Sequence, residues 1–298
     1  MSWTLYRWTW RLESPLFVGA PPAGSLNRCR LYVPSRALWG ALTAELARRR
    51  ANASPSYETE GTTLHENARF TYLFPAECDG KHWRAWLPRY EENNGLVWRR
   101  EDRPDSKHDI TNRQMRLRLL DARPGTAIDP DSDSAEEGSL RETECVLPRW
   151  RDIESPVAFV GYVFFKEGFS DLRDVKVIFV GGDTRYGLGR LRRVGELASS
   201  SDLFGAQVLL DQDAPMIQTS HLLAHTHLSD QAPKIVGSQE VLAGWDRTKA
   251  DAFRRTAETP LWTPGSQVCN GDVRKWKISR DGVWKFAPEG SGSHQGRG

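Results

Sequence analysis

The sequence predicts a mixed α+β protein, and three observations lead to this fold class. Residues 3–18 alternate apolar and polar side chains as a strand does, and a glycine-rich loop, a short apolar strand and one helix pattern follow them. Two further stretches, 157–165 and 175–180, have the composition of buried strands. Short β-rich stretches then recur at 207–210 and 274–286, without any heptad or solenoid period.

Length and composition describe a globular chain without a membrane segment. Its 298 residues suffice for one large domain or for two smaller units that share a core. No apolar run reaches about 18 residues, and residues 1–11 lack the pattern of a secretory signal. The four cysteines are far apart and form no CxxC pair, which argues against a disulfide framework and a zinc ribbon. We therefore expect a cytoplasmic protein that has no membrane contact and needs no metal or other cofactor.

The first elements follow from local patterns. The opening strand has an apolar face and a basic face, which carry Tyr6, Trp8, Trp10 and Leu12, and Arg7, Thr9 and Arg11, respectively. After a loop at 19–26, Ser35 can cap a helix that continues to about Arg50, where three consecutive arginines suit the negative end of the helix dipole. The polar stretch 52–65 is predicted to be a loop, and 70–74 a second strand.

The middle of the chain is charged and weakly periodic. Residues 93–147 are therefore predicted to form an extended insertion or hairpin outside the core. Basic residues prevail over 99–123, whereas 129–144 carries seven acidic residues against the single Arg141. The formal net charge of +2 is too balanced to establish a nucleic-acid partner by itself.

A glycine cluster at 181–190, with the sequence GGDTRYGLGR, directly follows the strand at 175–180. Closely spaced glycines let backbone N–H groups approach an anion, and Arg185 and Arg190 can add charge-assisted bonds to phosphates. The cluster lacks the Gly-Lys-Ser/Thr of a Walker loop, and a strand follows it instead of the helix of a dinucleotide-binding loop. A plain hairpin turn is the alternative, but the density of arginine favours an RNA backbone as the ligand.

Three segments together resemble the RAMP superfamily of CRISPR-associated proteins. The glycine cluster, of the form GG-x-x-R-x-G-x-G-R between two strands, is similar to the superfamily's signature G-loop. LESPLFVG at 12–19 followed by VPSRALWGAL at 33–42 resembles its opening strand and helix start. Residues 126–144 resemble the thumb hairpin of Cas-five and Cas-seven type subunits, which presses into the guide–target duplex.

The resemblance implies a ferredoxin-like, RRM-related RAMP fold of one or two units with a β-hairpin thumb insertion. It divides the chain into a core at 1–198 with the thumb at about 99–147, a β-rich C-terminal part at 199–287, and a disordered tail at 288–298. The implied partners are the CRISPR guide RNA, a backbone RAMP subunit of the same complex, and target RNA that is contacted through the thumb.

The residues implied for RNA binding belong to the glycine cluster, the helix start, the loop after the first strand, and the thumb region. They are Gly181, Gly182, Arg185, Tyr186, Gly187, Gly189, Arg190 and Arg192; Ser35 and Arg36; Asn27 and Arg28; and Arg113, Thr126 and Ile128. Ser35 and Arg36 would hold a phosphate at the helix N-terminus, although Ser35 serves equally as a plain cap.

Within the superfamily, the residues favour a non-catalytic subunit. Type III backbone subunits cut target RNA with an aspartate in the loop after the first strand, but residues 19–30 contain no Asp or Glu, and Asn27 supplies no carboxylate. Processing endonucleases need a histidine base, and the early chain offers only His65 and His82. The pattern looks closest to a Cas-five type subunit of type III-D or type VII complexes, which caps the five-prime handle of the guide; a backbone-type subunit is the alternative.

Two hypotheses from other classes remain open. His221, His225 and His227, with Asp230, have spacing that could place imidazoles on a metal and make the chain a metal-dependent RNA nuclease, although these positions share no face of one helix or strand. The 12 tryptophans instead suit a carbohydrate-binding or scaffold protein.

Overall fold

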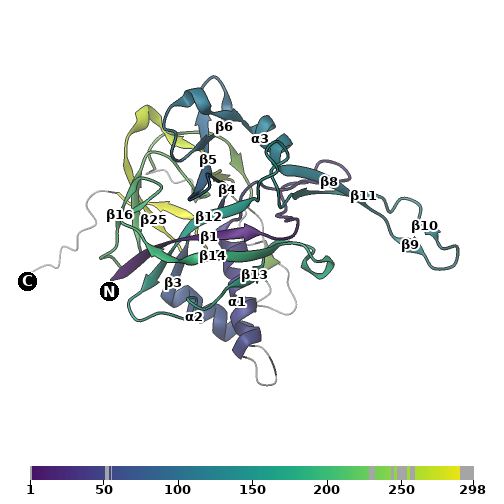
Figure 1. The fold of residues 1–298 in the computed structure, drawn as a ribbon. Coiled ribbons are helices and arrows are strands. Elements are labelled where there is room, and N and C mark those ends of the chain that lie inside the picture. The colour runs from purple at the N-terminus through teal and green to yellow at the C-terminus, as the bar shows by residue number, and fades with distance from the viewer. Residues whose placement is uncertain are drawn as a thin grey trace, which may run out of the picture.

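The computed structural model describes residues 2–50, 54, 56–227, 232–242, 245–246, 254–255 and 259–288. It is mixed α+β, with few helices and many strands, as the sequence predicts (Figure 1). Among the described residues, no helix is long and apolar enough to cross a membrane.

A large antiparallel sheet forms the centre of the molecule. Its strands follow one another in the order β13-β14-β1-β12-β4-β5-β6-β7, with β3 also paired to β12. Their bounds are β1 Trp3–Leu12, β3 Ala68–Phe70, β4 Phe74–Cys78, β5 Trp83–Glu91, β6 Gly95–Arg100, β7 Ile110–Thr111, β12 Ala158–Lys166, β13 Val177–Phe179 and β14 Arg190–Ser199. The predicted strands at the N-terminus, 157–165 and 175–180 are thus confirmed, although the first ends at Leu12.

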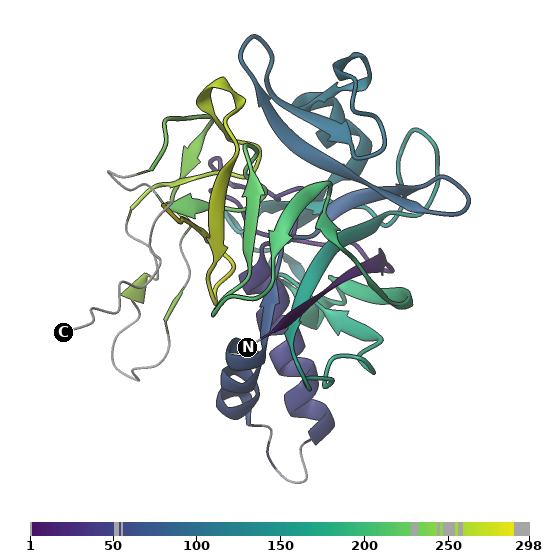
Figure 2. The same ribbon diagram turned by 90° about the vertical axis from the view of Figure 1, so that its left-hand side faces the viewer.

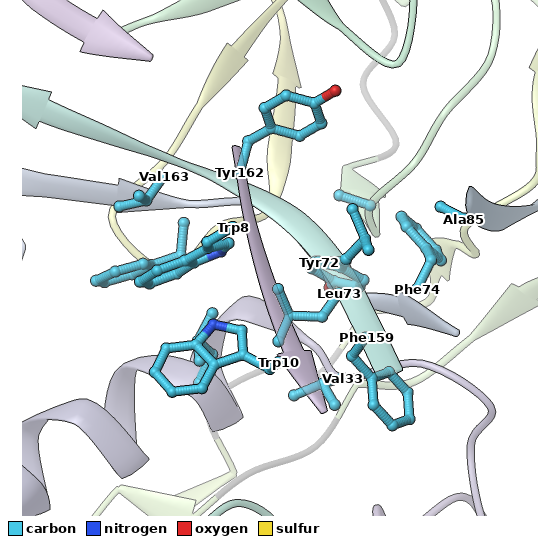
Figure 3. Close-up of a cluster of buried hydrophobic side chains, with 14 of the residues drawn as sticks. Trp8, Trp10, Val33, Tyr72, Leu73, Phe74, Ala85, Phe159, Tyr162 and Val163 are labelled. Carbon is cyan, nitrogen blue, oxygen red and sulfur yellow. The ribbon is translucent and has the colours of Figure 1, made fainter. Parts of the chain in front are cut away.

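The core of this sheet lies around β1 and β12. Eight of the nine residues of β12 are buried, which is typical of a strand covered on both faces. Trp8 and Trp10 both lie on the buried face of β1, and their rings meet edge to face at 5.4 Å (Figure 3). Gly161 lets the neighbouring segment approach β12 closely, because a Cβ atom there would lie 2.6 Å from the carbonyl oxygen of Tyr72.

Two helices cover one face. The predicted helix is confirmed as α1, Ser35–Arg50, but the loop predicted at 52–65 is wrong, because α2 occupies Tyr57–Asn67. Its sequence is polar, so no apolar stripe reveals it. Tertiary contact with α1 accounts for the helix: the indole N–H of Trp39 donates to the carbonyl oxygen of Gly61 at 3.2 Å, and Leu64 is fully buried.

The charged middle of the chain only partly leaves the core. After β6, the 3₁₀ turn η1 at Ser106–His108, strand β7 and helix α3 at Asn112–Leu119 pack onto the body, and Trp98 of β6 and Met115 and Leu119 of α3 are buried. The prediction that all of 93–147 lies outside the core is therefore wrong. Arg118 illustrates why the sequence misleads, since it binds Glu77 at 2.5 Å and its guanidinium lies over a tryptophan ring inside the structure.

A long hairpin at 120–146 projects from the body (Figure 1). It consists of β8, Leu120–Gly125, paired with β11, Arg141–Val146, and continues into the short β9, Ile128–Asp129, and β10, Ser134–Ala135. At its base, β11 also pairs in parallel with β2, Leu26–Asn27. We call this element the projecting hairpin.

The C-terminal part forms a second sheet against the first (Figure 2). Its strand order is β15-β16-β17-β25-β26-β18-β23-β20. The bounds, with those of two small strand pairs and the 3₁₀ turn η3, are β15 Asp202–Leu203, β16 Ala206–Leu209, β17 Met216–Thr219, β18 Thr226–His227, β19 Ile235–Val236, β20 Gln239–Glu240, β21 Trp245–Asp246, β22 Arg254–Arg255, β23 Leu261–Trp262, β24 Gln267–Val268, η3 Cys269–Gly271, β25 Arg274–Ile278 and β26 Trp284–Phe286. The predicted closing hairpin is confirmed as β25 and β26. Of the predicted tail, 289–298 lies outside the described residues.

One apolar core joins the two sheets, since Leu203, Ile217 and Trp276 belong to the same buried cluster as the tryptophans of β1. A buried polar network joins them as well. The hydroxyl of Tyr72 donates to Nδ1 of His225 at 2.7 Å, and Nε2 of His225 donates to the carboxylate of Glu240 at 2.6 Å. Burial lowers the pKa of His225 and keeps the imidazole neutral, which fixes these roles.

Arg30 completes this network from the N-terminal side. Its guanidinium, with the side chain only 8% exposed, binds the same carboxylate of Glu240. Burial alone would raise the pKa of Glu240, but the bonds from His225 and Arg30 to the ionised form lower it to about 2. The carboxylate of Glu240 thereby links the two sheets, because it binds His225 from the C-terminal part and Arg30 from the N-terminal part.

Candidate RNA-binding surface

The glycine cluster forms a compact loop between β13 and β14. Gly181, Gly187 and Gly189 have φ angles of +89°, +83° and +77°. At Gly189 the absence of a side chain is required, because a Cβ atom would lie 1.9 Å from the carbonyl oxygen of Val180. Gly187 faces open space, so only its backbone conformation calls for glycine.

Most of the glycine amides in this loop already donate within the protein. Those of Gly182, Gly187 and Gly189 bind the carbonyl oxygens of Phe17, Thr184 and Pro15 at 2.9, 3.1 and 2.8 Å. The bonds to Phe17 and Pro15 fasten the loop to the segment after β1. In the described part of the chain, the amides of Gly181, Asp183, Thr184 and Arg185 have no such acceptor, and the last two open the 3₁₀ turn η2 at Thr184–Tyr186. These four N–H groups, of which one belongs to a glycine, are the donors open to an anion.

Arginine side chains flank this turn. Arg185 is exposed and has no carboxylate within 4 Å among the described residues, and the ring of Tyr186 is 76% exposed beside it. Arg190 and Arg192, at the start of β14, instead bind Glu13 at 3.0 and 2.6 Å, and Arg11 binds it at 3.1 Å. Hydrogen bonds from Arg192 hold the pKa of Glu13 below its usual range, so this carboxylate is ionised among three cations.

The loop after β1 connects the glycine loop to the projecting hairpin. Phe17 accepts the bond from Gly182, while Leu16 pairs with Val146 at the hairpin base. Further along, Asn27 donates to the hydroxyl of Thr143 at 3.3 Å. Three segments far apart in the sequence therefore meet in one surface. Asn27 has a structural partner there.

Other exposed arginines extend this surface toward α3. Arg28, Arg113 and Arg123 are exposed, and none has a carboxylate within 4 Å in the described ranges. Arg113 lines a groove of about 460 Å³ between α3 and β8, in which Leu117 is also exposed. Together with Arg185, these three arginines form what we call the open arginine set. Four cations without counter-charges suit the phosphates of an RNA backbone.

Two predicted residues at the helix start lie elsewhere. Ser35 is buried, and its hydroxyl donates to the carbonyl oxygen of Asp281 in the turn between β25 and β26 at 2.9 Å. Arg36 is exposed, but its charge acts on His65, where Arg69 and Arg280 also gather. The structure therefore does not bring these two residues together with the glycine loop.

The outer part of the projecting hairpin carries the last two predicted residues. The hydroxyl of Thr126 shares a hydrogen bond of 2.6 Å with Ser139, and the side chain of Ile128 is 58% exposed. Beyond them, the tip is acidic, and bonds from the backbone N–H of Asp131 and from Ser132 keep Asp129 ionised by lowering its pKa. The tip of the hairpin is thus acidic, whereas its base carries Arg123 and Arg141 beside Asp121, Glu142 and Glu144.

The three histidines do not converge. His225 is buried between Tyr72 and Glu240, whereas Nε2 of His221 accepts a bond of 2.7 Å from Arg89. In the part of the chain that the structure describes, no group of three His, Cys, Asp or Glu residues is placed to hold a metal ion. Asp230 lies outside the described residues.

Two residues of the candidate surface, Arg123 and Glu13, are absent from the set predicted from the sequence. Arg123 lies in the basic stretch 99–123, so charge density was the signal that could have identified it. Glu13 carried no such signal, because its partners Arg190 and Arg192 are far away in sequence. Only the pairing of β1 with β14 brings them together.

The fold is similar to that of chains in known structures. No family model matches the sequence, and no curated protein matches it. Among solved structures, a chain from the Type III-B Cmr-beta bound to cognate target RNA and AMPPnP matches with a TM-score of 0.57 at 13% identity, over 88% of this chain and 85% of that one. A chain from the Type III-B Cmr-beta bound to cognate target RNA matches with a TM-score of 0.53 at 14% identity, over 88% and 86%. These chains share one fold.

The arrangement has the properties of a nucleic-acid surface more than of an active site. The open arginine set provides charge, Tyr186 provides an exposed ring for stacking, and the amides at η2 provide backbone donors. The carboxylate of Glu13, beside the glycine loop, is bound by arginines and is not poised for proton transfer.

Proposed function

We propose that this chain is a non-catalytic, RNA-binding subunit of a CRISPR effector complex. Guide RNA would lie across the glycine loop and the open arginine set, and the subunit would dock on a backbone subunit of the same complex. The observation that carries the proposal is the meeting of glycine loop, post-β1 loop and hairpin base in one surface that carries the open arginine set. The fold shared with Cmr-beta chains from target-RNA-bound structures supports it.

A ferredoxin-like RAMP core is part of this proposal. Four strands of the central sheet lie in the order β14-β1-β12-β4, and α1 with α2 connects β1 to β4 on one face. This is the order of the four strands in a ferredoxin-like unit. The second helix of such a unit has no counterpart between β12 and β14, where residues 167–176 form turns.

The projecting hairpin is proposed to act as a thumb on the guide–target duplex. Its exposed Ile128 and Leu140 offer apolar surface, while its acidic tip would be repelled by phosphates. Contact with the duplex is therefore expected along the middle of the hairpin, and not at its tip.

Within the complex, we propose that the chain caps the five-prime handle of the guide. The loop at 19–30 has no carboxylate for metal-assisted cleavage, and the buried partners of His225 leave it no free nitrogen for proton transfer. A subunit that holds the end of a guide needs neither group. It needs a defined basic surface, which the glycine loop supplies.

Binding of guide RNA tests this function. The purified chain with its backbone partner would be titrated with guide RNA whose five-prime handle is intact or scrambled, at two salt concentrations. We expect preference for the intact handle, and we expect Arg28→Ala and Arg185→Ala to weaken binding. Arg103→Ala is the matched control, because Arg103 is exposed and has no ion pair among the described residues.

The outcomes separate the alternatives. Equal, salt-sensitive binding of both RNAs would indicate a backbone-type subunit that does not read the handle. Absence of binding at low salt, or equal losses for Arg103→Ala and Arg185→Ala, would refute the proposed surface.

A further inference from the structure

A second polar cavity lies at the far end of β14 from the glycine loop. β14 spans ten residues, which places its two ends roughly 30 Å apart. The chain then turns through β15 and β16, and the cavity, of about 430 Å³, lies between this turn, β17 and β5. Figure 2 turns the C-terminal sheet toward the viewer. We call this cavity the Arg89 cavity.

Arg89 differs from the other arginines of its sheet region. Arg84, Arg99 and Arg100 each bind at least one carboxylate, Arg99 for example at 2.6 Å. In the described part of the chain, Arg89 has no carboxylate within 4 Å and donates only to Nε2 of His221. Burial, and then Arg99, lowers the pKa of Arg89, whereas Asp109 and Glu91 act from a distance to raise it. A half-buried cation with no carboxylate in contact is costly, and an anionic ligand would offset that cost.

A neutral His221 orients Arg89 at the same wall. Because the guanidinium can only donate, Nε2 of His221 accepts and Nδ1 carries the proton. Burial, and then Arg89, lowers the pKa of His221 to about 4, so the ring is neutral at pH 7. The Nδ1–H group finds no acceptor among the described residues, but its accessible surface is below 1 Å², so it does not open into the cavity. His221 therefore contributes to the cavity by holding the guanidinium of Arg89 in place.

The sheet floor beside this pair presents carboxamides. Gln207 of β16 and Gln218 of β17 are directly opposite in the antiparallel register, and Gln218 is opposite Lys275 of β25. Directly paired residues point to the same face, and here that face is the outer one, because Ile217 and Trp276 are buried. The result is a row of hydrogen-bonding side chains across three strands.

An aromatic residue under strain forms the remaining wall. Phe204 lines the cavity and has a φ of +50°, a conformation rare for a bulky side chain. Its ring is held edge to face by Tyr162 at 4.8 Å, and its amide donates to the hydroxyl of Tyr162 at 3.2 Å. Backbone strain of this kind clusters at ligand sites, where surrounding contacts maintain it.

We propose that the Arg89 cavity binds a nucleotide, with the phosphate on Arg89 and the base along Gln207 and Gln218 beside Phe204. The fork of donors on a guanidinium suits phosphate oxygens. Carboxamides bind the polar edges of bases, and an aromatic side chain contacts their faces. The volume falls within the about 300–1,000 Å³ typical of small-molecule sites. The nucleotide is either free or one unit of an RNA strand, which present the same chemistry here.

Calorimetric titration of the full chain tests this site. The probes are 5′-AMP, 5′-UMP, inorganic phosphate, a short single-stranded oligonucleotide and an oligoglutamate peptide. We expect Arg89→Gln to weaken nucleotide binding at least tenfold and Gln218→Ala to weaken nucleotide more than phosphate. Arg103→Gln is the matched control, and Arg89→Lys serves if Arg89→Gln fails to fold, because it keeps the charge but loses the fork of donors.

Each outcome of the titration either supports or overturns the proposed nucleotide site. Mononucleotide binding that depends on Arg89 supports a site for free nucleotides, and oligonucleotide binding alone with the same dependence supports an RNA unit. Binding that Arg89→Gln leaves unchanged, binding of the peptide only, or no binding at all overturns the proposal. Arg185→Ala should leave mononucleotide binding unchanged, so this test does not depend on the guide-RNA surface.

Discussion

Glu13 occupies the place that an RNA phosphate would take between arginines. Its side chain is 18% exposed and binds Arg11, Arg190 and Arg192, which are themselves 43–46% exposed. Glu13→Gln removes the negative charge and keeps a hydrogen-bond acceptor of the same shape. We therefore expect this substitution to release at least one arginine for guide RNA and to raise the affinity.

The size of the gain follows from counterion release. Each phosphate that a protein cation neutralises on a single strand adds about 0.7 to the slope of log affinity against log salt. One released arginine then corresponds to about fourfold tighter binding near about 0.15 M salt, and two to about fifteenfold. The cost in unfolding free energy should stay below about 2 kcal/mol, since exposed ion pairs contribute about 0.2–1 kcal/mol each.

Filter binding of labelled guide RNA over a series of salt concentrations measures both quantities. Glu196→Gln is the matched control, because Glu196 lies on the same strand β14, is 83% exposed and binds Lys176. Its removal changes the net charge equally but far from the glycine loop. Weaker binding by Glu13→Gln would refute the reasoning and show that the carboxylate orients the arginines for RNA. Equal gains in RNA affinity for both variants would show that the change in net charge alone causes the effect.

Three further predictions concern stability. Glu240→Ala should lower the free energy of unfolding by about 3–5 kcal/mol in urea, because it leaves the buried cation of Arg30 without its counter-charge. Gly187→Ala should cost about 1–2 kcal/mol for its left-handed backbone alone, whereas Gly189→Ala should cost at least twice as much, since its Cβ atom meets a carbonyl oxygen. The wild-type protein should lose stability as the pH falls from about 6.5 towards 4, because the unfolded chain takes up a proton that buried His221 resists, and His221→Gln should flatten this dependence.

Each of these predictions has an outcome that contradicts it. For the first, a Glu240→Ala protein as stable as Glu196→Ala would mean that the buried network contributes no more than an exposed ion pair. For the second, equal losses at the two glycine positions would show that the loop moves to accept a side chain. For the third, the same loss of stability between pH 7 and 5 in the wild type and His221→Gln would assign the dependence to other groups.

The sequence predicts those elements whose signal is local. The opening strand and the closing hairpin alternate apolar and polar residues, and the sequence of helix α1 has both a residue type that suits a cap and an apolar stripe. Helix α2 shows neither, since its stability comes from Trp39 of α1, which no local pattern reveals. The segment around α3 also misleads, because its arginines bind acidic partners inside the structure and so conceal buried Met115 and Leu119.

The candidate site likewise has features that follow from the local sequence and features that depend on long-range contacts. Exposure of Arg185 and Tyr186 follows from a glycine-rich turn, and the structure places both on the surface. The use of the glycine amides could not be predicted, since two of their three acceptors lie in the loop after β1. The same holds for Ser35, whose partner in the β25–β26 turn is 246 residues away. The local sequence shows which donors and charged side chains are present. Contacts between segments far apart in the sequence decide which of these groups remain free to bind a ligand.

The bond between Arg30 and Glu240 also has a consequence for biosynthesis. The two residues are 210 positions apart, and a ribosome needs about 10 to 40 s to cover that distance. Throughout that interval the nascent N-terminal half contains β1, α1 and Tyr72, but the carboxylate that neutralises Arg30 does not yet exist. The central sheet can therefore assemble its strands during translation, but it cannot close around Arg30 until the C-terminal sheet emerges. Any product that ends before residue 240 leaves Arg30 without the counter-charge that its burial requires.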